Sequence, residues 1–233
     1  MEYPLYRPVI AEAQHHSSLW RLLLGCVTVI AICIVWMVSI LAIVVWFTSG
    51  DFDLIEGRAM GPAETPGSVL VFLLLIVGLG VGAWGAARFW QKRDLRSLVG
   101  RGPRALRHFV QADAITFAMA ALVFVLTRPF AQPIEPNMEF GVWVLWLPAA
   151  LVCIALQTGA EELLFRGYLQ SQLAARFRNA AIWLFVPSLL FGIAHLAPGL
   201  PVNAALGYVI FAALFGLMAA DLTARTGTIG AAW

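Results

Sequence analysis

The sequence predicts an all-α protein: a polytopic bundle of transmembrane helices with about seven spans and a shortened eighth. Hydrophobic residues make up 61% of the 233 residues and charged residues only 12%, whereas a soluble domain is roughly half apolar and about a quarter charged. The charges are also clustered, so that residues 69–87 contain none and Leu19–Phe47 contains only Arg21. Uncharged apolar runs of about 18 residues or more are typical of membrane-spanning helices. A buried helix of a soluble protein does not explain several such runs in one short chain.

The predicted helices follow these apolar runs in chain order, separated by turn signals. The turn at 197–201, Ala-Pro-Gly-Leu-Pro, is a strong helix breaker, and Pro187 is expected to bend the helix before it. No repeat, linker or soluble region interrupts the pattern, so residues 1–233 are predicted to form one membrane domain. The expected spans are residues 19–47, 68–90, 109–126, 141–160 with a helical continuation to 177, 180–196 and 202–220, followed by a short apolar stretch from Thr228.

Basic residues gather on one side of the predicted membrane domain. Residues 88–107 contain seven Lys and Arg residues against Asp94 alone, whereas the loop 48–67 contains four acidic residues against Arg58. Because Lys and Arg collect on the cytoplasmic side of membrane proteins, we expect a cell-membrane protein whose N-terminus and 88–107 segment are cytoplasmic. Membrane lipid, including anionic headgroups, is the expected partner of this segment. Its place beside a span explains the arginines, so no nucleic-acid partner is expected.

One familiar motif is rejected on its context. Gly80-x-Gly82-x-x-Gly85 matches the dinucleotide-binding fingerprint, which requires a strand before it and a helix after it. Here the glycines lie inside an apolar run. They are therefore expected to let helices pack closely, as small residues do in membrane proteins.

Ionisable residues inside spans are costly and usually functional, and residues 161–166, Glu-Glu-Leu-Leu-Phe-Arg, contain three of them. Glu162 and Arg166 are four residues apart with the acid first, which is the favourable order for an ion pair on a helix. Glu161 points about 100° away from Glu162. It is expected to have no partner on its own helix, which suits a general base. The alternative is that both carboxylates begin a helix after Gly159 and interact with its dipole.

Phe191 and His195, four residues apart on the next helix, form the second group. A lone His on an apolar helix is more often a satisfied core residue than a catalyst. However, a turn at 178–179 would place Glu161 and His195 level with each other, about 25 Å from that turn at about 1.5 Å per residue. In such a hairpin, Glu161 would take a proton from water, and His195 would hold the water or stabilise the oxyanion.

The same residues argue for chemistry without a bound metal or cofactor. A catalytic zinc site needs three protein ligands. The chain offers two obvious ones, Glu161 and His195, and no HExxH motif. Metal-independent hydrolysis is therefore expected, with zinc as the alternative.

The two motifs, Glu161-Glu162-xxx-Arg166 and Phe191-xxx-His195, together resemble the first two motifs of the CAAX protease and bacteriocin-processing family of intramembrane proteases. The resemblance implies an all-helical membrane fold of about eight spans with a water-filled cavity open toward the cytosol. It also implies peptide-bond hydrolysis with Glu161 and His195 as catalytic residues, supported by Glu162, Arg166 and Phe191. Members of this family trim prenylated CAAX tails, process bacteriocins or confer immunity to them, or act as membrane scaffolds.

The resemblance covers about residues 147–233, the expected catalytic part, and lacks the family's third motif, a His followed four residues later by Asn. Residues 226–230 resemble the lead-in to that motif, just before Trp233. We therefore expect a longer protein whose continuation supplies the pair; the alternative is a short re-entrant end.

Arg176 and Arg178 bear on the topology of the predicted membrane domain. They fall outside the cell if the Glu161 helix crosses the membrane fully. If they are cytoplasmic, the site moves toward the outer leaflet.

Three functions are compatible with this pattern. The first is an intramembrane endopeptidase that acts on a peptide or membrane-protein substrate. The second is a non-enzymatic immunity factor or scaffold with the same fold. The third is a transporter, but the internal repeats with broken helices that are common in transporters are absent from the sequence. Endopeptidase and scaffold share every sequence feature, so only peptide cleavage by the purified protein separates them.

Overall fold

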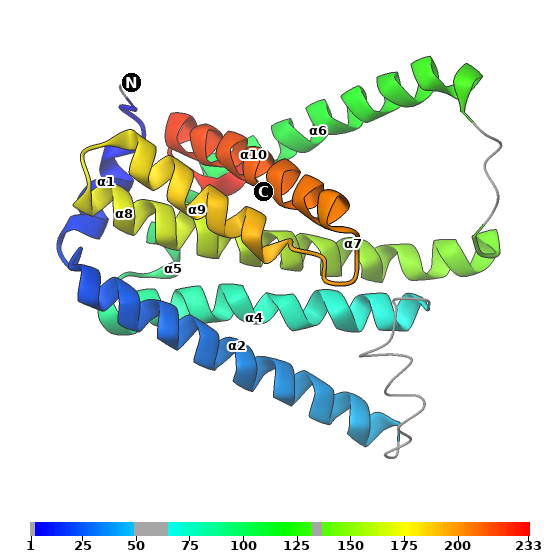
Figure 1. Ribbon diagram of the computed structural model, residues 1–233, viewed down its shortest axis with the longest axis horizontal. Helices are drawn as coiled ribbons and strands as arrows, with labels where there is room; N and C mark the ends of the chain where they lie inside the picture. Colours follow the sequence, from blue (N-terminus) through cyan, green and yellow to red (C-terminus); the bar gives the residue numbers. More distant parts are fainter. Residues whose placement is uncertain (1–2, 49–64, 132–136) are drawn as a thin grey trace.

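The computed structural model describes residues 3–48, 65–131 and 137–233, and it contains no strand in these ranges. The predicted all-α class is therefore confirmed. The elements are α1 (Arg7–Gln14), α2 (Leu19–Phe47), α4 (Pro66–Trp90), α5 (Leu95–Val99), α6 (Gly102–Thr127), η2 (Arg128–Phe130), α7 (Phe140–Glu162), η3 (Leu163–Gln170), α8 (Ser171–Arg176), α9 (Ala180–Ala194), α10 (Val202–Thr226) and η4 (Ile229–Ala231) (Figure 1).

Fewer helices span the membrane than the sequence suggested. Five described helices are long and apolar enough to cross, and α9 is a shorter apolar helix. The expected count of about seven treated 141–160 and the continuation to 177 as separate segments, whereas Phe140–Arg176 forms one continuous helical stretch of 37 residues. The apolar stretch from Thr228 contains the short 3₁₀ helix η4. The chain is thus a multi-pass membrane protein, and most of the acidic loop 48–67 lies outside the described residues.

Local sequence signals account for several helix ends. Thr65 and Ser68 form a reciprocal capping box at the start of α4, with Pro66 in the first turn. The Asn179 side chain accepts a hydrogen bond from the backbone N–H of Ala181 and caps α9. Gly227 ends α10 with a φ of 70°, a left-handed conformation that favours glycine. Pro187 lies inside α9 without interrupting it.

The glycines of α4 pack against two other helices. This is the role expected for them from the sequence once the dinucleotide-binding motif is rejected. A Cβ on Gly82 would lie 2.9 Å from the Cα of Val29 in α2. A Cβ on Gly80 would lie 2.8 Å from the Cα of Ala160 in α7, the residue just before Glu161. Close backbone approach on both faces therefore fixes α4 between α2 and α7 and sets the position of the Glu161 helix.

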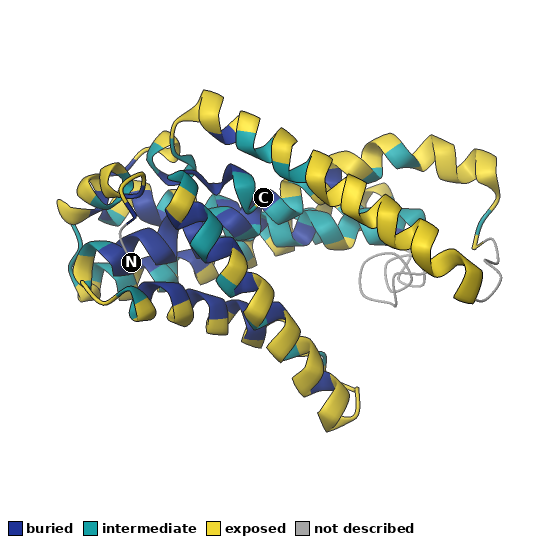
Figure 2. Ribbon diagram, turned by 90° about the horizontal axis from the view of Figure 1, so that it is seen from above, coloured by how far each residue is buried: buried dark blue, intermediate teal, exposed yellow. Residues whose placement is uncertain are grey.

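The buried residues concentrate in one half of the bundle. There α1 packs against α8 and α5, and α9 and η3 pack against α10, whereas the other ends of α2, α6 and α7 diverge and are exposed (Figure 2). The continuous α7–η3–α8 stretch ends at Arg176 in this same half (Figure 1). Arg176 and Arg178 therefore lie at the end where residues 92–101 lie. A single crossing by this one helical stretch would therefore leave Arg176 and Arg178 on the same side of the membrane as residues 92–101.

Candidate active site

Glu161 and Glu162 lie in the middle of the Phe140–Arg176 stretch, at the point where α7 changes into η3. The alternative that they begin a helix is therefore wrong. η3 is a π-helix of eight residues, Leu163–Gln170. Segments of π-helix are rare and frequently occur at functional sites, because their wider turn re-aims side chains. Seven of the eight η3 residues are buried, so this segment is held firmly in the core.

The predicted ion pair between Glu162 and Arg166 is present and buried. Arg166 donates to the Oε1 atom of Glu162 at 2.6 Å, and the side chains of Arg166 and Glu162 are only 1% and 5% exposed, respectively. The other oxygen, Oε2, has no hydrogen-bond partner among the described residues. Each charge of this pair therefore depends on the other, because a buried charge without a partner is strongly unfavourable.

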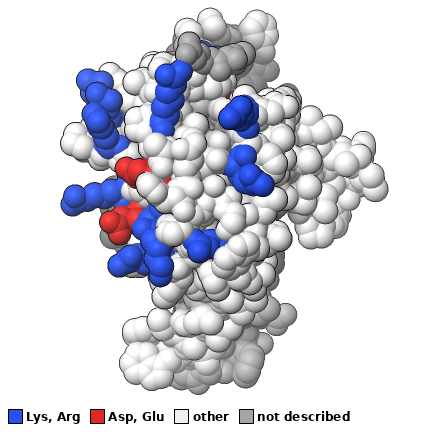
Figure 3. Space-filling model, turned by 90° about the vertical axis from the view of Figure 1, so that its left-hand side faces the viewer, with Lys and Arg blue, Asp and Glu red and all other residues white. Residues whose placement is uncertain are grey.

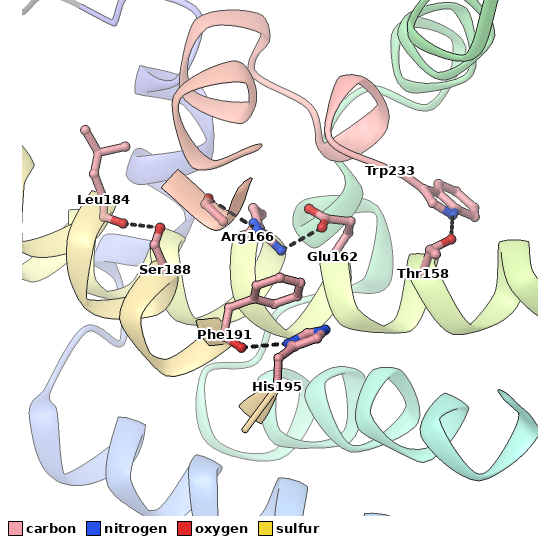
Figure 4. Close-up of polar contacts among 9 residues, drawn as sticks. Thr158, Glu162, Arg166, Leu184, Ser188, Phe191, His195 and Trp233 are labelled. Carbon is pink, nitrogen blue, oxygen red and sulfur yellow. Dashed lines mark hydrogen bonds and ion pairs between the residues drawn. The ribbon is translucent and has the colours of Figure 1, made fainter. Parts of the chain in front are cut away.

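Arg166 also connects three helical segments. Its second terminal nitrogen donates to the backbone oxygen of Gly216 in α10 at 3.2 Å. Its guanidinium lies over the ring of Phe191 in α9, 4.6 Å from the ring centroid, a favourable cation–π distance. Figure 4 shows Arg166 between Glu162 and Phe191, with His195 beyond the Phe191 ring. The pair therefore fixes how η3, α9 and α10 meet.

Phe191 in turn fixes His195. The two rings are 4.4 Å apart, and the Nδ1 atom of His195 lies 2.8 Å from the backbone oxygen of Phe191 (Figure 4). Because a carbonyl oxygen only accepts, Nδ1 must carry the proton in this contact. Nε2 is then the ring nitrogen available to other groups. His195 is exposed and caps the end of α9 instead of lying within an apolar helix.

Glu161 and His195 lie on the two helical arms that the predicted hairpin joins. The chain turns between Arg176 and Ala180, and the two side chains are near enough for their charges to interact, without a hydrogen bond or ion pair between them. Glu161 is half-buried, and the side chain of Gln157 is near enough to interact with it. Glu161 therefore has a polar neighbour one helical turn earlier, which was not expected from the sequence.

Two groups at this site were not predicted. Gln157 could have been found, since it is a polar residue in an apolar run, four residues before a carboxylate. The Gly216 backbone oxygen has no comparable signal in the sequence. Within residues 3–48, 65–131 and 137–233, no group of three or more His, Cys, Asp or Glu side chains is placed to hold a metal ion.

Comparison with known proteins bears on the segment that contains this site. Residues 140–233 match the family model described as type II CAAX prenyl endopeptidase Rce1-like. This part of the chain is thus similar to the Rce1-like family. The match includes all five predicted site residues, and the family is one of intramembrane proteases. The resemblance seen in the two sequence motifs is therefore confirmed.

A second comparison extends beyond the Rce1-like segment. The chain is 26% identical over 230 residues to the uncharacterized protein YyaK of Bacillus subtilis (strain 168). The aligned region covers 94% of this chain and 75% of YyaK, so the similarity includes the amino-terminal helices. No solved structure matches the chain.

Proposed function

We propose that this protein is an intramembrane endopeptidase that hydrolyses peptide bonds with a water molecule activated by Glu161 and His195. The observation that carries the proposal is that these two side chains, from separate helices, are near enough for their charges to interact, inside the segment that matches the Rce1-like family model. A carboxylate and an imidazole that share one site can divide the work between proton transfer and charge stabilisation. Every catalytic group then comes from this chain, and no metal is required.

In the proposed reaction, water lies between Glu161 and His195. Glu161 takes one proton from the water while the water oxygen bonds to the carbonyl carbon of the scissile peptide. The carbonyl oxygen becomes an oxyanion. As the carbon–nitrogen bond breaks, the proton moves from Glu161 to the leaving amine. Hydrolysis thus yields a new amine and a new carboxylic acid, which retains the second hydrogen of the water, and leaves Glu161 ionised again.

His195 is assigned to holding the water and stabilising the oxyanion. Its Nδ1 proton is engaged by the Phe191 oxygen, which fixes the ring and leaves Nε2 for the reacting groups. Arg166 acts one step further away, because it packs on Phe191 and pairs with Glu162. Glu162, Arg166 and Phe191 are therefore positioning residues in this proposal.

The substrate is a peptide or a membrane protein with its scissile bond near the membrane. The Rce1-like description names CAAX prenyl endopeptidases, so peptides with a prenylated carboxyl-terminal CAAX sequence are the first substrates to test. We also propose that the N-terminus and residues 88–107 face the cytoplasm. Arg176 and Arg178 lie at the same end of the bundle as the residues of that segment. This concentration of basic residues at one end supports the orientation.

The test is peptide cleavage by the purified protein in neutral detergent. The wild-type protein should cleave a peptide from a prenylated and unprenylated panel, and Glu161→Ala and His195→Ala should each abolish cleavage while remaining folded. Glu139→Ala is the matched control, because Glu139 is an exposed carboxylate at the start of the same helix. Full activity in Glu161→Ala would overturn the assignment. A folded wild-type protein that cleaves no peptide would favour the scaffold or immunity function instead.

A further inference from the structure

A second site lies at the basic end of the bundle, away from Glu161 and His195. It is a cavity of about 790 Å³ between α1, α5 and the first turn of α6, with residues 226–228 closing one side. Figure 3 shows Lys and Arg side chains gathered over this end of the molecule. None of the five residues assigned to the endopeptidase site lines this cavity.

Positive charge dominates the cavity lining. Two acidic residues, Glu12 and Asp94, lie on its wall, whereas the cationic residues that line it number five: Lys92, Arg93, Arg96, Arg101 and Arg104. Arginines at the cytoplasmic end of a membrane protein are expected. Their convergence on one cavity is a further feature, because several guanidinium groups around a hollow create a strong field for anions.

Arg93 is the most informative of these residues because its guanidinium is buried, with the residue only 4% exposed. It donates to the hydroxyl of Ser171 at 2.7 Å and to the hydroxyl and backbone oxygen of Ser97 at 3.1 and 2.9 Å. All three acceptors are neutral, and Arg93 has no ion pair among the described residues. Burial accordingly lowers the pKa of Arg93, against the opposing effect of Tyr6 and Glu12. A buried cation on a cavity wall whose direct hydrogen-bond acceptors are all neutral would be stabilised further by an anion in the cavity.

The backbone around the cavity also favours an anion. α6 begins at the cavity with Gly102, and its N-cap residue, Arg101, makes no side-chain capping bond. Pro103 has no N–H, and the N–H groups of Arg104 and Ala105 donate to the Arg101 backbone oxygen, so among the first four residues of this helix the Gly102 N–H is the one available to an anion. Gly100 allows its backbone to lie close to that of Gly227 across the cavity lining. Its φ is 87°, and a Cβ there would lie 2.6 Å from the backbone oxygen of Gly227. Lys92 has a φ of 58°, a rare conformation for a side-chain-bearing residue.

We propose that this cavity binds a phosphate group, carried by the headgroup of an anionic membrane lipid or present as the free ion. Arginine is well suited to phosphate because its planar fork donates two parallel hydrogen bonds. The surroundings favour a lipid, because α5 lines a second, apolar groove of about 310 Å³ through Leu95 and Val99. A phosphate in the cavity and an acyl chain along that groove would place one lipid around α5.

The experiment measures thermal stability of the purified protein in neutral detergent at low salt. Short-chain phosphatidylglycerol, short-chain phosphatidylcholine and inorganic phosphate are titrated separately. Ligand that binds the folded protein raises Tm in a concentration-dependent way. We expect phosphatidylglycerol to raise Tm at concentrations where phosphatidylcholine has no effect. An equal rise in Tm with inorganic phosphate would show that the free ion is sufficient to occupy the cavity.

Two double variants with equal charge change decide whether the cavity is responsible. Arg96→Gln with Arg101→Gln alters exposed cavity residues, and Arg107→Gln with Arg178→Gln alters exposed arginines outside the cavity. The first pair should raise the half-saturating concentration by about tenfold or more, the factor that corresponds to about 1.4 kcal/mol. The second pair should leave it unchanged. Equal weakening in both variants, or equal stabilisation by the two lipids, would overturn the proposal.

Discussion

The buried ion pair between Glu162 and Arg166 gives the sharpest stability prediction. Glu162→Ala leaves Arg166, which is 1% exposed, without an anionic partner among the described residues. The Gly216 oxygen and the Phe191 ring remain as its contacts. Removing one member of a buried pair costs roughly 3–5 kcal/mol because the other charge stays buried. The retained contacts place the expected loss near the lower limit, at about 3 kcal/mol.

The assay is thermal unfolding of the purified protein in detergent. A loss of about 3 kcal/mol corresponds to a Tm decrease of roughly 6–12 °C, at about 2–4 °C per kcal/mol for a chain of this size. The matched control is Arg225→Ala, which breaks the exposed pair of the same i, i+4 spacing with Asp221. That variant should leave Tm unchanged, because exposed pairs contribute little and Asp221 keeps its hydrogen bond from Tyr3.

A double variant, Glu162→Leu with Arg166→Met, separates the pair from each residue's other contacts. Replacing both charges with apolar side chains removes the buried-charge penalty, so the double variant should be more stable than Glu162→Ala. Equal Tm values for Glu162→Ala and Arg225→Ala would refute the reasoning. A double variant as unstable as the sum of its single variants would refute it as well.

Three further predictions concern packing, topology and metal. Gly192 lies three residues before His195, and a Cβ there would lie 2.6 Å from the backbone oxygen of Val209. Gly192→Ala should therefore lower the rate of hydrolysis by about tenfold or more, since small displacements of catalytic groups reduce rates strongly. Gly207 has open space around it, so Gly207→Ala should leave the rate unchanged. A cytoplasmic reporter inserted after Arg178 should be active and an external reporter after Ala131 should be active; the reverse pattern would contradict the orientation. Hydrolysis should survive prolonged dialysis against a zinc chelator, and its loss with recovery on added zinc would refute the metal-independent mechanism.

The long apolar helices were predictable from the sequence because their signal is composition. Leu19–Phe47 matches its predicted bounds, and α9 ends two residues before the expected position. Other bounds were less accurate: α6 begins at Gly102 instead of 109, and α10 ends at Thr226 instead of 220. The largest difference is the 37-residue stretch Phe140–Arg176. Its polar centre at 157–162 resembled a boundary, although tertiary contacts with α4 and α10 continue the helix through it. Sequence patterns also give no sign of a π-helix, since it differs from an α-helix only in hydrogen-bond register.

The candidate site was predictable where spacing alone determines contact. The i, i+4 order fixed the Glu162–Arg166 pair, and residue counts on either side of one turn brought Glu161 level with His195. The link from Arg166 through Phe191 to His195 was not predictable, because it depends on how α9 rotates against η3. The same holds for the basic cavity, which α1, α5 and α6 form together.

The most direct test of the central claim is the rate of peptide hydrolysis by Glu161→Gln, measured beside the wild type on the same substrate. Glutamine keeps the size of the side chain and its capacity to interact with Gln157, but it cannot take a proton from water. If Glu161 is the general base, hydrolysis should fall by about 10²–10⁴-fold while Tm stays unchanged. A Glu161→Gln protein that is folded and hydrolyses the peptide at the wild-type rate would contradict the account.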